Sequence, residues 1–439
     1  MNVRVLVATI AAVLLAGLMP AAAQLEPTPP GWQIERAILL SRHGVRAPTQ
    51  SNAELDKLTA SAWPTWPVAP GFLSPQGDVL MREMGSYYRL LYGGRGLVQA
   101  DDCPAAGTVA AWTDIDERTR VSGAALLAGM YPRCANLSLR NQANFNVPDP
   151  LFHPQPTASC PMDPAATRTA ILARTGGSLA TLQRDYATPL KMMQTVLCPN
   201  DTTATAAAGG TCGEAGKPTT IETDANGRTW FKGPLGLGST ASEAFLMQAA
   251  QGMPKDQVAW GRLAGDASLM ELLTLHLLDM DLTEKTPAIA RQHGSNMLSL
   301  IATTLESGYK FPGAQPVGQP VRFGVLVGHE TNIYNVASLL DLTWQVPGFL
   351  AGQASPGGAL AFELFRAGSQ RFVRIAYYAQ TLDELRHRTR LNYRDPPGMK
   401  VVDLPACKAQ SQQHACPLER FLEITKAALE PQCLTAGSP

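Results

Sequence analysis

The stretch LLSRHGVRAPT, residues 39–49, sets His43 directly after Arg42 and three residues before Arg46. A second cation beside guanidinium groups is disfavoured, so these neighbours should keep the His43 imidazole neutral. Guanidinium groups also bind the oxygens of a phosphate in a bidentate manner. A neutral imidazole beside such arginines is arranged for nucleophilic attack, and the segment therefore predicts phosphoryl transfer to nitrogen.

A second segment, VLVGHETN at residues 325–332, places His329 and Glu330 directly after another apolar run. A helix is expected to follow, with Thr331 or Asn332 as its N-cap. His329 would be a further donor to phosphate oxygens, on which charge develops in the transition state. A leaving alkoxide needs a proton, and a carboxylic acid near the scissile oxygen can supply it, which makes Glu330 the candidate general acid.

Arg118, in the segment TDIDERTR at residues 113–120, is the third candidate cation. The segment is expected to begin a helix near Asp116 or Glu117. An arginine in the first turn opposes the helix dipole, and a bound anion would explain its presence there. The alternative is that Arg118 forms an ion pair with Asp114, Asp116 or Glu117, and the sequence leaves both interpretations open.

Short apolar runs precede each of these polar groups. Residues 37–40, 109–112 and 323–327 have the length and composition of strands buried on both faces, as in a parallel sheet. Open parallel sheets bind their ligands beyond the carboxyl ends of the strands. His43 and His329 should therefore meet across one crevice.

The chain is expected to fold as an α/β protein with a mainly parallel central sheet flanked by helices and a smaller, mostly helical second domain. Residues 161–284 carry Ala-rich and Leu-rich helical patterns and the pattern of a hairpin that turns at Asn226 and Gly227. We therefore expect a catalytic α/β domain made of residues 24–160 and 285–439, with residues 161–284 inserted as a helical domain.

The first 23 residues are typical of a secretory signal peptide, because Arg4 precedes an apolar stretch that ends in small residues up to Ala23. The stretch is shorter than the about 20 residues that span a membrane. We expect cleavage after Ala23, a periplasmic or secreted location, and no membrane attachment of the mature chain. The 36 basic and 36 acidic residues balance, so there is no overall field for nucleic acid and any anion site must be local.

Eight cysteines form an even set in a chain that is expected to be exported, which indicates disulfides. No C-x-x-C motif occurs, and HETNI lacks the spacing of a zinc protease, so no metal or cofactor is expected. Many pairings are possible, and the sequence alone favours only the local loops Cys198–Cys212 and Cys407–Cys416.

Three motifs together resemble those of the histidine acid phosphatases: RHGVRAPT at residues 42–49, DERTR at 116–120 and HETN at 329–332. The segments WPTWPV, LSPQG, PDPLF, QGMP and SPGG are similar to those of bacterial periplasmic phytases and glucose-1-phosphatases in that family. The resemblance covers nearly all of the mature chain. It implies a fold like that of phosphoglycerate mutase and hydrolysis of small phosphate esters at acidic pH without a cofactor.

The resemblance also implies a role for each of the main candidates. His43 would become phosphorylated, water would hydrolyse the phosphohistidine, and Glu330 would protonate the leaving group. The phosphate would be held by Arg42, Arg46, Arg118 and His329. Further substrate contacts are expected from Thr49 at the pocket wall and from Gln50, Asp114, Glu243, His276, His293 and Thr331. The implied disulfides are Cys103–Cys134, Cys160–Cys433, Cys198–Cys212 and Cys407–Cys416.

Three positions depart from the family pattern. The family usually has aspartate in place of Glu330, and one extra methylene moves the carboxyl by about 1.5 Å on a fixed backbone. Either the local backbone compensates or turnover is slow. Gln50 replaces a lysine that is common in these phytases, and His293 lies near an expected arginine. Both changes remove positive charge, which weakens the case for inositol hexakisphosphate as the substrate.

Several of these residues also have plainer interpretations. Glu243 could be a solvated helix residue, and His276 could be a histidine that fills the core. His153, His387 and His414 are scattered along the chain and are assigned no role.

Two hypotheses of different classes remain. The first is a monomeric acid phosphatase that acts on phytate, with glucose 1-phosphate or another small sugar phosphate as the alternative substrate. The second is a phosphate-ester binding protein in which Glu330 has lost catalytic reach. A cofactor-dependent mutase is disfavoured, because an exported chain has little access to phosphoglycerates.

Overall fold

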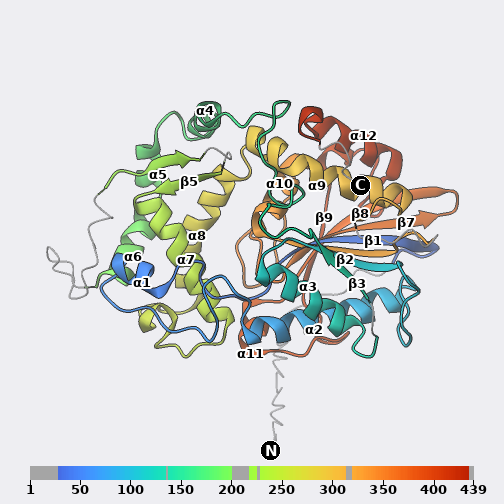
Figure 1. The fold of residues 1–439 in the computed structure, drawn as a ribbon, viewed down its shortest axis with the longest axis horizontal. Helices are drawn as coiled ribbons and strands as arrows, with labels where there is room; N and C mark the ends of the chain where they lie inside the picture. The colour runs from blue at the N-terminus through green and yellow to red at the C-terminus, as the bar shows by residue number, and fades with distance from the viewer. Residues whose placement is uncertain (1–27, 135–136, 200–216, 225–227, 313–318, 435–439) are drawn as a thin grey trace, which may run out of the picture.

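The computed structural model describes residues 28–134, 137–199, 217–224, 228–312 and 319–434. A large sheet with helices on both faces lies on the right in Figure 1, and a group of helices with a small hairpin lies on the left. The expected signal peptide, residues 1–23, lies outside the described residues. Within the described part, every helix is too short or too polar to cross a lipid bilayer.

The central sheet has eight strands in the order β10-β8-β7-β1-β6-β2-β3, with β9 paired to β8. The neighbours β1, β6, β2 and β3 pair in parallel, whereas β7 to β10 pair antiparallel. The predicted α/β class is confirmed, and the sheet is mixed rather than mainly parallel. The strands are β1 Trp32–Arg42, β2 Val109–Thr113, β3 Ser138–Asn141, β6 Phe323–Gly328, β7 Ala359–Ala367, β8 Gln370–Ala379, β9 Gly398–Val402 and β10 Ala415–Pro417.

The antiparallel half of the sheet is built around a hairpin that the sequence analysis did not anticipate. β7 and β8 are joined by Gly368 and Ser369, and Gly368 has a positive φ of 60°. Tight two-residue connections need a residue that tolerates the left-handed backbone. Most residues of both strands are buried, so their largely apolar sequences carry no signal for the direction of pairing.

Alternate residues of β1 pack against different helices. Ile38 and Leu40 belong to the apolar core on one face of the sheet, and Ala37 and Leu39 belong to the core on the other face. Because side chains alternate across a strand, both sets must be apolar, which explains the continuous apolar run. One face is covered by α2 Pro75–Gly94 and α3 Glu117–Met130, and the other by α9 Pro287–Ser307, α10 Glu330–Leu339 and α12 Leu418–Ala428 (Figure 1).

The group on the left of Figure 1 is mainly helical, with α7 and α8 on the side toward the sheet. Its antiparallel hairpin β4–β5 is confirmed, although the expected turn at Asn226 and Gly227 lies outside the described residues. The element types agree with the expected insertion over residues 161–284, whose bounds stay a prediction. The elements are α4 Pro164–Arg174, α5 Leu179–Asp185, α6 Ala187–Leu197, β4 Thr220–Thr223, β5 Thr229–Lys232, α7 Pro234–Ala250 and α8 Asp266–Thr283. The short helices α1 Asn52–Leu55 and α11 Leu382–His387 complete the set.

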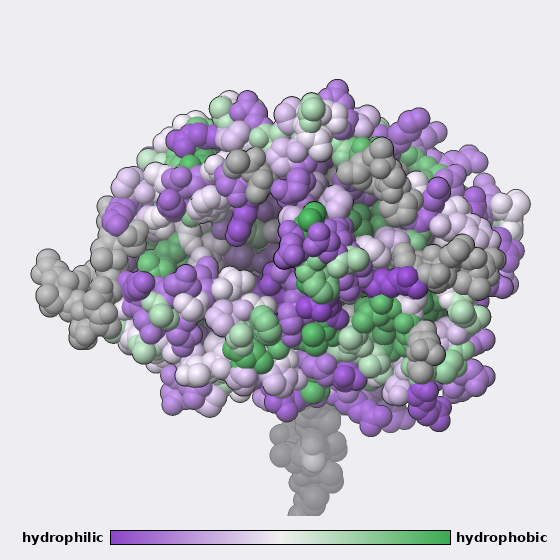
Figure 2. All heavy atoms as spheres, viewed as in Figure 1, coloured by the Kyte–Doolittle hydropathy of each residue, from purple (hydrophilic) through white to green (hydrophobic). Residues whose placement is uncertain are grey.

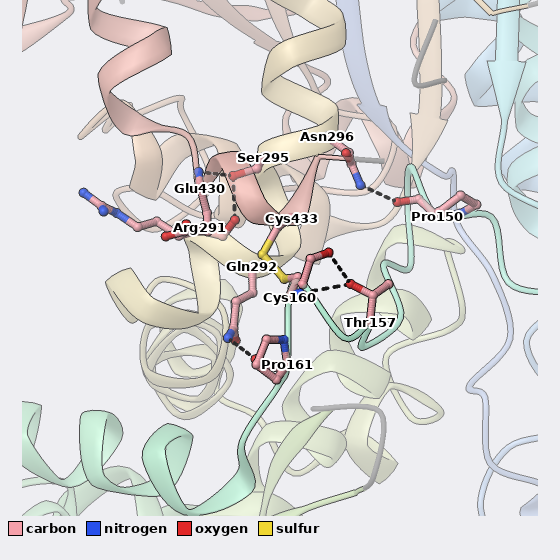
Figure 3. The surroundings of a disulfide bond; sticks show 11 residues. Pro150, Thr157, Cys160, Pro161, Arg291, Gln292, Ser295, Asn296, Glu430 and Cys433 are labelled. Carbon is pink, nitrogen blue, oxygen red and sulfur yellow. Dashed lines mark hydrogen bonds between the residues drawn. A yellow bond between two sulfur atoms is a disulfide. The ribbon is translucent and has the colours of Figure 1, made fainter. Parts of the chain in front are cut away.

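The described residues contain three of the four implied disulfides: Cys103–Cys134, Cys160–Cys433 and Cys407–Cys416. Cys198 is also disulfide-bonded, but its expected partner Cys212 lies outside the described residues. Figure 3 shows how Cys160–Cys433 ties the C-terminal segment to the segment that precedes α4.

Two hydrogen bonds support this disulfide on α9. Gln292 Nε2 donates to Pro161 O at 3.0 Å, and the Glu430 N–H donates to Ser295 Oγ at 2.9 Å (Figure 3). The C-terminal segment is therefore fixed to the same helix that covers the central sheet.

Candidate active site

Three neighbouring strands deliver the main polar groups to one edge of the sheet. His43 follows β1, His329 follows β6, and Asp114 follows β2. The strand pairing aligns these ends, because the His43 N–H donates to Gly328 O at 2.9 Å and the Asp114 N–H donates to Val327 O at 3.0 Å. The centroids of the His43 and His329 rings lie 5.6 Å apart, which confirms the predicted meeting across one crevice.

The helices α3 and α10 begin at this edge. α3 begins at Glu117, with Asp116 as its N-cap, which confirms the predicted start near these two residues. α10 begins at Glu330 with His329 as its N-cap, so the prediction of Thr331 or Asn332 as the N-cap was wrong. The reason is that Asn332 acts from inside the first turn, where its Oδ1 accepts from the His329 N–H at 2.9 Å. Glu330 therefore lies at a helix N-terminus, which stabilises negative charge.

The His43 ring is buried and held in one orientation. Its Nδ1 lies 2.9 Å from Gly44 O, and a carbonyl only accepts, so Nδ1 carries the proton and Nε2 keeps its lone pair. Burial, together with the charges of Arg118, Arg46 and Arg42, holds the pKa of His43 well below its usual value. The imidazole is therefore neutral and able to attack through Nε2.

Guanidinium groups of Arg42 and Arg46 approach the same region from β1 and from the loop after it. Arg42 is 1% exposed, forms an ion pair with Glu243 and lies 3.1 Å from Glu330 Oε1. Arg46 Nη2 lies 3.6 Å from Glu243 Oε1. The Nε atoms of Arg42, Arg46 and Arg118 are buried and have no hydrogen-bond partner among the described residues. Buried donors ordinarily meet an acceptor, so these atoms suit an anionic ligand.

Arg118 forms the ion pair that the sequence analysis offered as one interpretation, and anion binding by this residue stays a prediction. Its Nη2 forms an ion pair with Asp116 Oδ2 at 2.5 Å and lies 3.4 Å from His329 Nδ1. The charge of the arginine is thus offset in part by the N-cap carboxylate of its own helix, and its guanidinium group lies beside His329.

Asp114 fixes the ring of His329 and also contacts a histidine that the sequence analysis missed. Its Oδ2 accepts from His329 Nε2 at 2.7 Å and from His153 Nε2 at 2.9 Å. Although burial raises the pKa of Asp114, these two hydrogen bonds lower it well below its usual value. Burial lowers the pKa of His329 to about 4, so this ring is also neutral at mildly acidic pH.

The role of His153 could not be read from local sequence. It lies in a loop between β3 and α4, without the apolar strand that precedes His43 and His329. Its pKa is lowered by burial but raised by the hydrogen bond and charge of Asp114, with a net increase.

A second polar cluster joins α7, α8 and α10. His276 Nε2 lies 3.1 Å from Glu330 Oε2 and 3.6 Å from Glu243 Oε2. Burial alone would raise the pKa of Glu330, but Arg42 and His276 lower it to about 2. Glu243 is 6% exposed and ion-paired, so its interpretation as a solvated helix residue was wrong. His276 is buried but polar in its contacts, so it does more than fill the core.

Glu243, His276 and Glu330 line a cavity of about 130 Å³, and His43, Arg118 and His329 are not among its lining residues. The cavity lies between the sheet and the helices α7 and α8. Figure 2 shows the surface hollowed between these two parts of the molecule. The lining residues are Arg46, Pro48, Thr49, Gln50, Ser239, Thr240, Glu243, Ala244, His276 and Glu330. A larger cavity of about 630 Å³ lies beside the disulfide of Figure 3, and none of the predicted catalytic or substrate-binding residues lines it within the described structure.

Three of the expected substrate contacts, Asp114, His293 and Thr331, are not brought to this cavity. Asp114 is fully buried beneath His329 and His153, where it accepts their hydrogen bonds. His293 lies on α9 with its Nδ1 3.9 Å from Glu284 Oε2, and Thr331 lies in the first turn of α10. Neither residue is among those that line the cavity. Thr49 and Gln50 do line it, and the Thr49 hydroxyl donates to Gln50 Oε1 at 3.2 Å.

Two groups in the site have residue types that bind metal ions. One consists of Asp114, Asp116, His153 and His329, and the other of Glu243, His276 and Glu330. In each group, carboxylates already pair with an arginine, Arg118 in the first and Arg42 in the second. The cationic partners make both groups poorer metal sites than their residue types alone indicate.

A profile of the histidine phosphatase superfamily, branch 2, matches residues 33–378. The chain belongs to this family. It is a histidine acid phosphatase, a phosphomonoesterase of the phytase type.

Several known proteins are similar to this phosphatase in sequence and in fold. Phytase AppA of Escherichia coli is 35% identical over 92% of this chain and 94% of its own length. Glucose-1-phosphatase of Salmonella typhimurium is 28% identical over 95% and 98%. The phytase of Hafnia alvei has a TM-score of 0.86 at 34% identity, covering 93% of this chain and all of that one. A further structure of the Hafnia enzyme, in complex with myo-inositol hexakis sulphate, has a TM-score of 0.84 at 34% identity over the same shares of both chains.

Proposed function

We propose that this histidine acid phosphatase transfers the phosphoryl group of its substrate first to His43 and then to water. The observation that carries the proposal is the neutral His43 ring, whose proton lies on Nδ1 toward Gly44 O and whose Nε2 is free. The charges of Arg118, Arg46 and Arg42 all act on this ring. An uncharged nucleophile amid fixed positive charge is what attack on an anionic phosphate ester requires.

The phosphate would be held by Arg42, Arg46 and Arg118, and by His329 once the phosphate charge brings a proton to its Nδ1, since its Nε2–H already donates to Asp114. The buried Nε donors of the three arginines have no acceptor among the described residues, and a bound phosphate would supply oxygens to that region. Asp114 holds His329 through Nε2, which directs Nδ1 toward Arg118 and away from the carboxylate. Asp114 therefore serves as a positioning residue in this proposal.

The reaction would proceed in two displacements. In the first, His43 Nε2 forms a bond to phosphorus while the ester P–O bond breaks, and Glu330 gives its proton to the leaving oxygen. In the second, water attacks the phosphohistidine, the P–N bond breaks, and the proton of the water returns to the Glu330 carboxylate. The products are the alcohol and orthophosphate.

The geometry supports compensation for the longer side chain of Glu330. Its carboxylate reaches Arg42 through one oxygen and His276 through the other, both at 3.1 Å. A carboxylate fixed at two points is positioned well enough for proton transfer, which is an argument against slow turnover or a mere binding role.

For the substrate, we propose phytate. The phytase of E. coli supports this through 35% identity, and the Hafnia phytase through the structure in which it holds myo-inositol hexakis sulphate. Glucose 1-phosphate is the alternative. It is favoured by Gln50, which lines the cavity without a charge, and by His293, which lies outside the cavity.

A substrate panel tests the proposal. We expect kcat/KM for phytate to exceed that for glucose 1-phosphate, and the Gln50→Lys variant to increase the preference because it restores a cation at the cavity wall. The reverse order of kcat/KM in the wild type would assign the enzyme to the glucose-1-phosphatases instead.

Export, organisation and oligomeric state are part of the same proposal. The disulfides are typical of proteins in oxidising compartments, so we propose a periplasmic or secreted, monomeric enzyme. We also propose that residues 161–284 form an inserted helical domain, with residues 24–160 and 285–439 as the catalytic domain.

A further inference from the structure

We propose that His276 stores the proton that Glu330 delivers to the leaving group, and that Ser239 and Asp279 position the His276 ring. The inference rests on the proposed role of Glu330 as the general acid. It adds a second residue to the acid function and assigns two polar side chains to its support, the buried Ser239 and the half-buried Asp279.

The geometry forms a chain of four polar side chains from three helices. His276 Nε2 lies 3.1 Å from Glu330 Oε2 on α10, and His276 Nδ1 lies 3.0 Å from Ser239 Oγ on α7. Asp279 lies one turn after His276 on α8, and the nearby Ser239 hydroxyl lowers the pKa of its carboxyl, whose Oδ1 has no hydrogen-bond partner among the described residues. His276 and Ser239 are buried, with 5% and 4% of their surfaces exposed.

α7 and α8 pack against each other at Gly238 and Leu275. A Cβ at Gly238 would lie 2.6 Å from Leu275 Cδ1, closer than side-chain carbons pack. Gly238 and Leu275 directly precede Ser239 and His276 in the sequence. A side chain at Gly238 would therefore displace the end of the Leu275 side chain, beside Ser239 and His276.

The charges around His276 determine where the proton resides in the ligand-free site. Burial by itself lowers the pKa of His276, but Glu330 on α10 and Glu243 on α7 raise it to about 9, while Arg42 on β1 opposes them. Asp279 on α8 contributes a further carboxyl, whose pKa burial raises to about 6. Because the pKa of Glu330 falls to about 2, the pair is a carboxylate and an imidazolium at working pH.

An imidazolium has two N–H donors, and both have acceptors here. Nε2–H donates to Glu330, Nδ1–H donates to Ser239 Oγ, and the Ser239 hydroxyl is free to donate to Asp279. Each N–H and O–H of these side chains thus has a defined acceptor. The ring is held with Nε2 toward the carboxylate that must become an acid.

Substrate binding would move the proton from His276 to Glu330. Arg42 is a main cause of the low pKa of Glu330 but only a minor influence on His276. A bound phosphate anion offsets the charge of Arg42, so it raises the pKa of Glu330. The Nε2 proton then passes to Oε2, which converts a charged pair into a neutral pair without proton uptake from solvent. Glu330 gives this proton to the leaving oxygen, and the proton released by water in the second displacement returns to His276 through Glu330.

The experiment compares two kinds of ester in the full-length enzyme. Glycerol 2-phosphate leaves as an alkoxide that needs a proton, whereas 4-nitrophenyl phosphate leaves without help. For His276→Gln, we expect kcat on glycerol 2-phosphate to fall by about 10²-fold, and kcat on the aryl ester to fall by less than about tenfold. Equal losses on both esters would overturn the proposal, since they would indicate general damage to the site.

The pH profile tests the positioning residues. In Asp279→Asn, the loss of a negative charge lowers the pKa of His276, so the alkaline limb of kcat on glycerol 2-phosphate should move to lower pH. The control is Asp281→Asn on the same helix, which removes an ion pair with Arg174 instead. An unmoved alkaline limb in Asp279→Asn would overturn the role of Asp279.

Ser239→Ala should lower kcat on glycerol 2-phosphate selectively. Its matched control is Ser242→Ala, because the Ser242 hydroxyl is equally buried on α7 but donates only to the Ser239 carbonyl. Equal behaviour of the two serine variants would contradict the role of Ser239.

A Glu330→Gln variant separates this proposal from the one on which it rests. If Glu330→Gln loses activity selectively on glycerol 2-phosphate and His276→Gln does not, only the role of His276 is wrong. If Glu330→Gln loses activity equally on both esters, the general acid itself is wrong, and both proposals fall.

Discussion

The side chain of Glu330 spans the gap between Arg42 and His276, with one carboxylate oxygen 3.1 Å from each partner. In a Glu330→Asp variant, the carboxylate retreats by about 1.5 Å on a fixed backbone. Both contacts would then exceed hydrogen-bond distance. Although aspartate is the usual family residue, this site is built for the longer acid, and we expect the substitution to be harmful.

The size of the loss follows from this displacement. A misplacement of about 1 Å costs about 10²-fold in rate, which corresponds to about 2.7 kcal/mol of transition-state stabilisation. We therefore expect kcat of Glu330→Asp on phytate to fall by about 10²-fold. On 4-nitrophenyl phosphate, whose leaving group needs no proton, we expect a loss below about tenfold.

Steady-state kinetics at acidic pH with both esters provides the assay. The control is Glu284→Asp, which shortens a nearby carboxylate that accepts from Asn335 Nδ2 outside the cavity. Full activity of Glu330→Asp on phytate would refute the reasoning, because the length of the acid would then not set the geometry of proton transfer.

Three further predictions concern pH and stability. His43 attacks only when neutral, and its pKa is well below its usual value, so the acidic limb of kcat/KM should lie well below pH 6.5; a limb near that value would contradict a depressed pKa. His153→Asn removes a positive neighbour that lowers the pKa of His329, so this pKa should rise above about 4 in an NMR titration; an unchanged value would remove His153 from the site. Replacing Cys160 and Cys433 by alanine removes a disulfide between residues 273 positions apart. Calorimetry should then show a lower Tm and a loss of about 2–5 kcal/mol in the free energy of unfolding. An unchanged Tm would show that this disulfide does not stabilise the fold.

The parts of the site that follow buried parallel strands could be predicted from sequence. The runs before His43 and His329 are apolar on both faces, which is typical of strands at the centre of a covered sheet. Because parallel strands share one carboxyl edge, the two histidines had to meet there. The family motifs then supplied the arginines and Glu330.

Other parts depend on packing that local sequence does not encode. His153 reaches Asp114 from a loop, and no strand or helix pattern marks its position. The strands β7 and β8 form an antiparallel hairpin in one half of the sheet. A buried strand has the same composition whether it pairs parallel or antiparallel. His293 was expected at the cavity from the family resemblance. It lies on α9, and its ring faces Glu284 instead of the cavity.

The central claim is that His43 carries the phosphoryl group during turnover. Rapid acid-free quenching of the enzyme with ³²P-labelled substrate, followed by peptide mapping, measures this directly. We predict an acid-labile, alkali-stable phosphate on the peptide that contains His43, and its loss in His43→Ala. Continued turnover of His43→Ala, or labelling of a different residue in the wild type, would contradict the account.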